Sequence, residues 1–213
     1  MPGQKLTDFY DRISDRYDLI MNMSGYTLIS RLLINTIPTH FKSPVVLDMG
    51  CGTGITSGLI RKRFTDAGIT GLDNSKKMLE IYSKKFPGNQ TLLGDFNRNN
   101  GFRTYPEDIP VILPSMSFDI VISAGAVLEY GILEKAFSLI YRLLKTDGMA
   151  VIIGTKKNIF TDMLGNIYWK YKLPRSRDVN TLLTKIGFSH VSNNSNHTYF
   201  PISLFKEIII AWK

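Results

Sequence analysis

The sequence predicts one doubly wound α/β domain, in which helices cover both faces of a mostly parallel β-sheet. From Val45 onward, short apolar segments of strand length alternate with amphipathic segments of helix length. Strands that are buried on both faces and separated by helices form parallel sheets. The chain has 213 residues, 44% of them hydrophobic, which suffices for a single compact domain with a sizeable core.

Seven strands are expected in this sheet. Segments of helix length separate the first five, and right-handed crossovers then favour a parallel, doubly wound arrangement of these strands. Only about ten residues join the last two strands, too few for a helical crossover, and we expect this pair to be antiparallel. The expected strands are 45–49, 69–73, 91–95, 118–123, 149–154, 188–193 and 204–212, and the helical segments are 54–67, 75–85, 131–145 and 178–186.

The residues 1–40 are expected to form lid helices in front of the core. Apolar residues recur at three- and four-residue spacing from Leu6 to Ile20, which places them on one helical face. Ser24 is the expected cap of a second helix that ends before Pro38. The core is expected to comprise residues 41–213, with insertions near 99–112 and 155–175.

The composition limits the class of protein. The single cysteine, Cys51, rules out an internal disulfide, so a cytoplasmic location is expected. The apolar runs are too short to cross a bilayer. The net charge is +8, but Lys and Arg are scattered along the chain, whereas nucleic-acid binders concentrate them on one face. Nucleic acid is therefore the less favoured partner, and the composition leaves the oligomeric state open.

A glycine-rich segment directly after the first strand marks the expected ligand site. Ligands bind at the carboxyl ends of strands in open α/β sheets, and Asp48–Gly54 (DMGCGTG) lies at such an end. This segment lacks the Gly-Lys pair of a phosphate-binding loop, and Ile55 or Ser57 stands where the dinucleotide fingerprint requires its third glycine. A carboxylate at the strand end suits a cationic ligand better than a pyrophosphate.

This acidic-x-Gly-x-Gly-x-Gly pattern resembles the first motif of the class I S-adenosylmethionine-dependent methyltransferases. Acids also end the next two strands, at Asp73 and Asp95, and Ser117–Val121 and Ile140–Gly148 are similar to later motifs of that family. The sequence departs from the family pattern with Thr-Asp-Gly in place of Pro-Gly-Gly at 146–148. Within the class, the chain looks most like the small-molecule methyltransferases related to the ubiquinone and menaquinone C-methyltransferases.

The resemblance implies a Rossmann-like seven-stranded sheet with an antiparallel last strand, and S-adenosylmethionine as the cofactor. Asp73 stands where the family places an acid that hydrogen-bonds both ribose hydroxyls, and Asp95-Phe96 where it holds the adenine. Tyr17 matches a position that reaches the methionine end of the cofactor. The implied cofactor-binding residues are Tyr17, Asp48, Gly50, Cys51, Gly52, Asp73, Asn74, Met78, Asp95, Phe96 and Ala124.

Structural roles remain open for several of these residues. Asp48 could form the turn, and Asp73 could cap the helix that begins near residue 75. Met78 could pack in the core. Cys51 is most simply a small buried residue, because no partner is visible that would make it a nucleophile.

Two residues are candidate general bases, which are needed only if the acceptor must lose a proton. Glu129 follows the fourth strand, where a helix-capping or solvent-facing carboxylate is the alternative. His197 lies in the loop between the last two strands, where most histidines are simply solvated. The sequence shows no cluster of metal ligands.

The sequence therefore predicts a methyltransferase that acts on carbon or oxygen of a small-molecule acceptor. The amino-methylase motif Asn/Asp-Pro-Pro-Tyr/Phe is absent after the fourth strand, where 123–130 reads SAGAVLEY. One alternative is an RNA or protein methyltransferase, suggested by the net charge and the aromatic, basic segment Trp169–Arg177. Another is a catalytically silent cofactor-binding module, because a fold alone does not establish chemistry.

Overall fold

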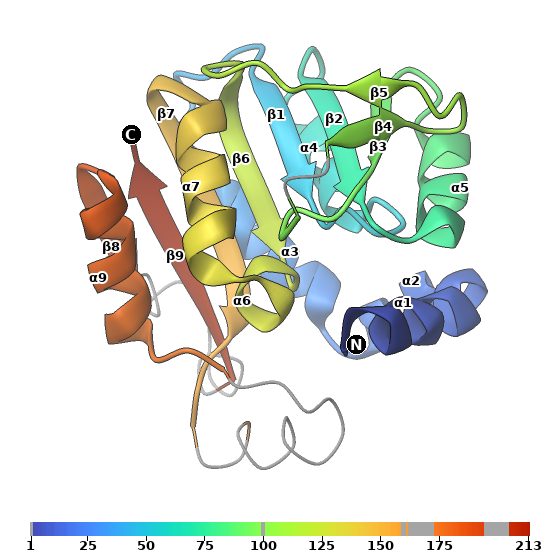
Figure 1. Ribbon diagram of the computed structural model, residues 1–213, viewed down its shortest axis with the longest axis horizontal. Coiled ribbons are helices and arrows are strands. Elements are labelled where there is room, and N and C mark those ends of the chain that lie inside the picture. Colours follow the sequence, from blue (N-terminus) through green and yellow to red (C-terminus); the bar gives the residue numbers. More distant parts are fainter. Residues whose placement is uncertain (1, 99–100, 159–160, 162–172, 194–204) are drawn as a thin grey trace.

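The computed structural model describes residues 2–98, 101–158, 161, 173–193 and 205–213, with the side chains of 2–6 left out. Within these residues, nine strands form one sheet in the order β5-β4-β3-β2-β1-β6-β7-β9-β8 (Figure 1). The strands are β1 Val45–Met49, β2 Gly68–Asp73, β3 Gln90–Leu93, β4 Phe102–Thr104, β5 Pro110–Val111, β6 Phe118–Ala124, β7 Leu144–Thr155, β8 His190–Asn193 and β9 Lys206–Trp212.

The middle of the sheet is parallel and has the winding expected of a doubly wound fold. β1 pairs in parallel with both β2 and β6, and β6 pairs in parallel with β7. The chain therefore winds away from β1 in one direction through β2 and β3, and returns to its other side at β6. A crevice opens at such a reversal, beyond the carboxyl ends of the strands.

The seven strands expected from the sequence are present, and β9 runs antiparallel to both β7 and β8 as predicted. The expected total of seven is wrong, because the sheet has two more strands in its described part. β4 pairs antiparallel with β3, and β5 with β4, so a small hairpin occupies the expected insertion. Strands of three and two residues, the second beginning at Pro110, are too short to show a strand periodicity in the sequence.

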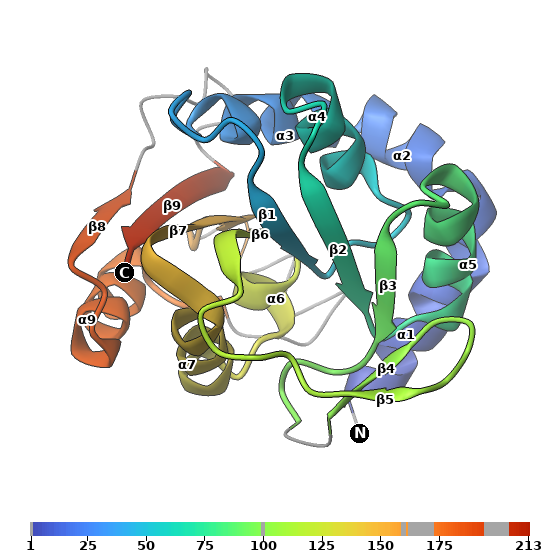
Figure 2. The same ribbon diagram turned by 90° about the horizontal axis from the view of Figure 1, so that it is seen from above.

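Helices cover both faces of the sheet (Figure 2). On one face, α3 (Tyr26–Asn35) and α4 (Ile55–Arg63) pack on strand residues such as Val46, and on the other α7 (Leu133–Leu143) and α9 (Ser176–Ile186) pack with residues such as Leu47. Successive residues of β1 thus pack into the hydrophobic clusters on opposite faces of the sheet, because strand side chains alternate between faces. α5 (Lys76–Lys85) packs beside β2 and β3.

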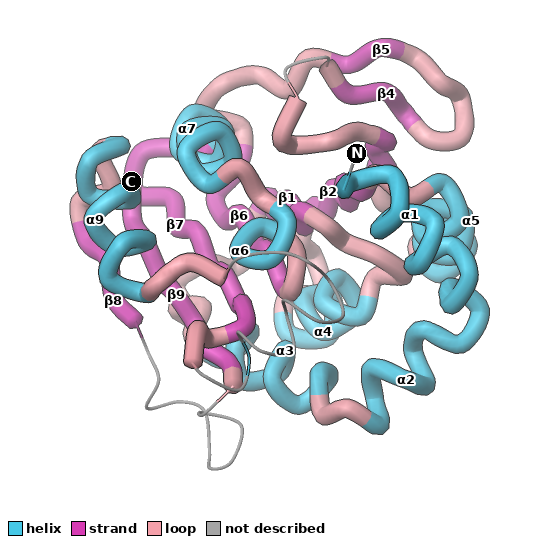
Figure 3. The backbone as a smooth tube through the Cα atoms, turned by 60° about the horizontal axis from the view of Figure 1, so that its bottom comes forward, coloured by secondary structure: helices cyan, strands magenta, loops and turns pink. Residues whose placement is uncertain are grey.

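The N-terminal helices lie at the carboxyl ends of the parallel strands (Figures 1 and 3). The single face expected from Leu6 to Ile20 is divided between α1 (Pro2–Ile13) and α2 (Tyr17–Met23), with a 3-10 turn at Ser14–Arg16 between them. None of the helices in the described ranges is long and apolar enough to cross a membrane.

The expected role of Ser24 as the cap of α3 is wrong. Gly25, at φ +77°, precedes this helix and provides no side chain to cap it. The Ser24 hydroxyl instead donates to the Met21 carbonyl at 2.9 Å, toward the preceding helix. A left-handed turn favours glycine, and this turn allows α2 and α3 to follow each other directly.

Candidate functional site

The site begins at the glycine loop between β1 and α4. Gly50, Gly52 and Gly54 have φ values of +78°, +52° and +89°, which are accessible to glycine at little cost. The N–H groups of Gly50 and Cys51 both donate to the Leu72 carbonyl, at 2.8 and 3.1 Å. The loop therefore turns sharply after β1 and is held against the end of β2.

Asp73 at the end of β2 completes this junction. Its Oδ2 accepts the N–H of Gly52 and its Oδ1 accepts the N–H of Ser75, both at 2.9 Å. Burial raises the pKa of the Asp73 carboxyl, against the lowering effect of these backbone donors. The residue that caps the following helix is Ser75 and not Asp73, because the Ser75 hydroxyl accepts the N–H of Met78 at 3.1 Å. A carboxylate has about four acceptor sites, so Asp73 keeps capacity for hydroxyl donors of a ligand.

A cleft lies over this junction and brings together most of the expected cofactor residues. Asp73 and Asp95 stand in its wall at the ends of neighbouring strands. The expected residues that line the cleft are Tyr17, Gly50, Gly52, Asp73, Asn74, Met78, Asp95, Phe96 and Ala124.

The cleft has further lining residues that the expected set did not contain. They are Thr7, Tyr10, Asn97, Gly125, Ala126 and Tyr130. Tyr10 could have been predicted to line the cleft, because in the sequence it lies on the same helical face as Tyr17. Asn97 gives no such signal, because its place depends on long-range contacts: its Nδ2 donates to the Tyr130 carbonyl at 3.1 Å, and its side-chain oxygen accepts the N–H of Ile132.

Asp95 is the more open of the two acids in the cleft. Its Oδ1 accepts the N–H of Asn97 at 2.9 Å, and its Oδ2 lies 3.3 Å from Nε of Arg98. The side chain of Asp95 is 29% exposed. Its carboxylate is therefore oriented by the turn after β3 and still accessible to a ligand.

Two of the expected cofactor residues, Asp48 and Cys51, are buried and do not line the cleft. Asp48 Oδ2 accepts the hydroxyl of Ser57 at 2.7 Å, and this hydroxyl also lies 3.0 Å from that of Tyr82. Burial raises the pKa of Asp48 to about 7. Since β1 side chains alternate, the side chain of Asp48 turns toward α4 while the backbone continues into the loop.

A second cavity of about 470 Å³ adjoins the cleft, within the usual range for small-molecule sites. It lies between the N-terminal helices and the ends of β6, β7 and β9, and most of its lining is apolar or aromatic, including Phe9, Ile20 and Tyr26. The residues that line both the cleft and the cavity are Tyr10, Tyr17, Gly125 and Tyr130. The two spaces are therefore neighbours across a wall of three tyrosines and one glycine.

Hydrogen bonds hold this wall together. The hydroxyls of Tyr10 and Tyr130 lie 2.8 Å apart, which joins α1 to α6 (Val127–Tyr130). The Tyr26 hydroxyl donates to the Ala124 carbonyl at 2.6 Å. Burial, with the charge of Asp73 among smaller causes, raises the pKa of Tyr17, so this hydroxyl stays protonated.

Glu129 lies in the wall of the cavity and is only 7% exposed. It is neither solvent-facing nor a helix cap, which corrects both structural alternatives. Its Oε1 accepts the backbone N–H of Thr155 at 2.7 Å and the hydroxyl of the same residue at 3.0 Å. The other candidate base, His197, lies outside the described residues.

The cleft fits a nucleoside carrying a positive charge. A Cβ placed on Gly52 would meet only the Tyr17 ring, at 3.8 Å, so a ligand can approach this backbone closely. Asp73 and Asp95 supply acceptors for hydroxyl and amino groups, and their charges favour a cation. Among the described residues, no group of three or more His, Cys, Asp or Glu could hold a metal ion.

Comparisons with known proteins agree with this site. A family model described as a methyltransferase domain matches residues 46–148. The demethylmenaquinone methyltransferase of Thermotoga maritima is 27% identical over 172 residues, which are 78% of this chain and 69% of that protein. The chloroplastic 2-methyl-6-phytyl-1,4-hydroquinone methyltransferase 2 of Oryza sativa is 30% identical over 149 residues, 68% of this chain but only 39% of that protein.

A solved structure supports the fold over its whole length. The TehB-like S-adenosylmethionine-dependent methyltransferase of Corynebacterium glutamicum superposes with a TM-score of 0.66 at 18% identity, covering 97% of this chain and 98% of that one. At this identity the likeness concerns the fold alone. The matched methyltransferase domain and the relatives identify the chain as a class I S-adenosylmethionine-dependent methyltransferase, with S-adenosylmethionine as its cofactor.

Proposed function

We propose that this protein transfers the methyl group of S-adenosylmethionine to a carbon or oxygen of a small-molecule acceptor. The observation that carries the proposal is the mainly apolar cavity of about 470 Å³ beside the cofactor cleft. Tyr10, Tyr17 and Tyr130 separate the two spaces. A molecule in the cavity would meet the methyl donor at this wall.

The residues of the chain bind the cofactor, orient the acceptor and exclude water. When bound, the cofactor supplies a methyl group activated by a sulfonium, so alignment of the acceptor is the main catalytic requirement. Asp73 and Asp95 supply the acceptors that would hold the ribose and the adenine. The helices α1 and α2 cover the cleft and the cavity, and their aromatic residues keep water from the reacting groups.

Those relatives that are named for quinones and hydroquinones support an aromatic acceptor. Two of them are named for demethylmenaquinone and for a phytyl hydroquinone. Phe9, Tyr10 and Tyr26 line the cavity, and aromatic side chains pack well against planar rings. We therefore propose a planar, largely apolar acceptor.

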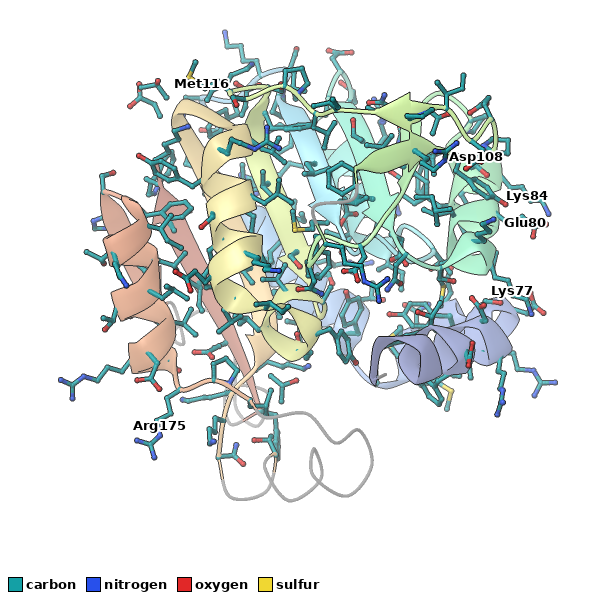
Figure 4. All side chains as sticks on the ribbon, in the orientation of Figure 1. Lys77, Glu80, Lys84, Asp108, Met116 and Arg175 are labelled. Atoms are coloured by element: carbon teal, nitrogen blue, oxygen red, sulfur yellow. The ribbon has the colours of Figure 1, made fainter. Side chains whose placement is uncertain are left out.

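Macromolecular acceptors receive less support. Four of the nine residues in the segment Trp169–Arg177 that suggested RNA, namely 169–172, lie outside the described residues. The labelled basic residues are spread over the molecule: Lys77 and Lys84 project from α5, whereas Arg175 projects near α9 at the opposite end (Figure 4). Lys84 is also paired with Glu80 at 2.7 Å. We place the protein in the cytoplasm as part of the proposal, because its one cysteine is free and buried.

The test is transfer of a deuterated methyl group. The protein is incubated with methyl-deuterated S-adenosylmethionine and, separately, with small-molecule, RNA and protein fractions of cells that express it. We expect the label in one or a few apolar small molecules, identified by mass spectrometry. Label confined to RNA or protein would refute the small-molecule acceptor. Cofactor binding without transfer to any fraction would support a catalytically silent module.

A further inference from the structure

The acceptor cavity holds one acidic and one basic side chain among its described lining residues, Glu129 and Lys206. Both lie at the end where β7 and β9 meet. The Lys206 Nζ donates to the Thr155 hydroxyl at 2.8 Å and lies 3.9 Å from Glu129 Oε1. Glu129, Thr155 and Lys206 therefore form a polar corner, named here the Glu129 corner, in a mainly apolar cavity.

The two oxygens of Glu129 differ. Oε1 accepts two hydrogen bonds from Thr155, whereas Oε2 is buried and has no hydrogen-bond partner within the described part of the chain. The side chain is 4% exposed. Buried carboxylate oxygens are normally hydrogen-bonded. Because Thr155 fixes Oε1, the carboxylate cannot turn its free oxygen away without losing those bonds.

Charge limits the group that Oε2 can receive. An anionic group, such as a carboxylate, would be repelled by Glu129 at short range. A cationic amine would be attracted by Glu129 but repelled by Lys206, whose Nζ lies 3.9 Å from Oε1, so the existing ion pair leaves it little net attraction. A neutral hydroxyl meets neither penalty. It donates one hydrogen bond to the unpartnered carboxylate oxygen, which can only accept.

We propose that Glu129 Oε2 is the anchor for a neutral hydroxyl, phenolic or enolic, carried by the planar acceptor. This inference rests on the proposed function, because it assumes that the cavity binds the acceptor. Glu129 is thus a specificity-determining residue, which selects a hydroxyl on an otherwise apolar molecule. It also fixes which edge of the acceptor faces the wall of Tyr10, Tyr17 and Tyr130.

The test compares the binding of three probes that share one ring system. The probes are 2-naphthol, which donates a hydrogen bond, its ether 2-methoxynaphthalene, which only accepts, and 2-naphthoate, which is an anion. Each is titrated calorimetrically into the whole protein saturated with S-adenosylhomocysteine. We expect 2-naphthol to bind about tenfold more tightly than either of the other two, as one charge-assisted hydrogen bond implies.

Glu129→Gln is the decisive variant. The Thr155 donors would hold the amide oxygen in the place of Oε1, so the amide nitrogen, a donor, would replace the free acceptor. We expect the preference for 2-naphthol over its ether to fall to less than about threefold. The matched control is Glu207→Gln, which alters another buried glutamate, outside the cavity lining. Its Oε2 accepts the Ser176 hydroxyl, and its Oε1, like Oε2 of Glu129, has no hydrogen-bond partner among the described residues. This control should keep the full preference.

The outcomes separate this inference from the proposed function. Equal binding of 2-naphthol and its ether by the wild-type protein, or no binding of 2-naphthol, would overturn the role of Glu129 Oε2. An unchanged preference in Glu129→Gln would overturn it as well. The cofactor titration is independent of these results, since a protein that does not bind S-adenosylhomocysteine at all would contradict the proposed function itself. Circular dichroism checks that both variants are folded.

Discussion

The carboxylate of Asp73 accepts the backbone N–H of Gly52 at 2.9 Å, across the gap between the ends of β2 and β1. One side chain thereby fixes the glycine loop and presents its remaining acceptor capacity to the cleft. The loop and the acid cannot move independently, because the carboxylate that lines the cleft also accepts the N–H of Gly52. Binding and loop geometry are therefore coupled at this residue.

The glycine loop should not tolerate a side chain at its first glycine. A Cβ on Gly50 would stand 2.3 Å from the Cβ of Ala126, and its φ is +78°. We expect Gly50→Ala to lower the free energy of unfolding by at least 1–2 kcal/mol, roughly the cost of a left-handed residue. We also expect it to abolish measurable cofactor binding, which calorimetry would detect.

Gly68→Ala is the matched control for this substitution. Gly68 begins β2, where an added Cβ would meet nothing within 4 Å. Its φ lies outside the left-handed range, so its unfolding curve and cofactor affinity should stay close to those of the wild type. If Gly50→Ala bound the cofactor as well as Gly68→Ala does, the loop would not have the tight geometry described above.

Asp48 should make the protein less stable as the pH rises. Burial raises the pKa of this carboxyl from 3.8 to about 7, with the charge of Asp73 adding to the shift and the Ser57 hydrogen bonds opposing it. Between about pH 4 and about pH 7, the folded protein holds a proton that the unfolded chain has lost. The free energy of unfolding therefore falls through this window, by a few kcal/mol at about 1.4 kcal/mol per pKa unit.

Asp48→Asn should remove this part of the pH dependence. The amide keeps an oxygen for the Ser57 hydroxyl and carries no charge to desolvate. We expect the variant to be more stable than the wild type at about pH 8, and the difference to shrink at about pH 5. Urea unfolding at the two pH values measures this. Equal pH dependence in both proteins would show that Asp48 does not titrate in this window.

The hydrogen bond between Tyr10 and Tyr130 should contribute to cofactor binding, because it joins α1 to α6 over the cleft. Tyr10→Phe and Tyr130→Phe should each weaken S-adenosylhomocysteine binding, and the double variant should be little worse than either. A double-mutant cycle should give a coupling of about 0.5–1.5 kcal/mol, typical of one neutral hydrogen bond. Additive effects would mean that the two hydroxyls act separately.

The sequence predicted the parts of the fold and site that local pattern determines. Apolar strands that end at Asp73 and Asp95, with glycines after the first strand, predicted that these residues line one cleft, as they do. These residues lie together because parallel strands end at one edge of the sheet. Gly52 and Asp73 are 21 positions apart, yet their meeting followed from the order of the strands.

Long-range contacts could not be predicted in this way. The hairpin of β4 and β5 pairs with β3 through strands too short to have a period. The side chain of Asp48 points away from the cleft, where its partner Ser57 also contacts Tyr82. These residues come together only in the packed structure. The hydrogen-bond partner of Glu129 is Thr155, 26 positions later at the end of β7. The orientation of the Glu129 carboxylate could therefore not be predicted from the sequence.

The central claim is that the Asp73 cleft binds S-adenosylmethionine, and calorimetric titration of Asp73→Ala with S-adenosylhomocysteine tests it most directly. Asp73→Asn is measured beside it, since it keeps the shape of the side chain. In a variant shown to be folded, we expect Asp73→Ala to lose on the order of 1.5–3 kcal/mol of binding free energy, the value of hydrogen bonds to a charged group. Wild-type affinity in folded Asp73→Ala would contradict the account.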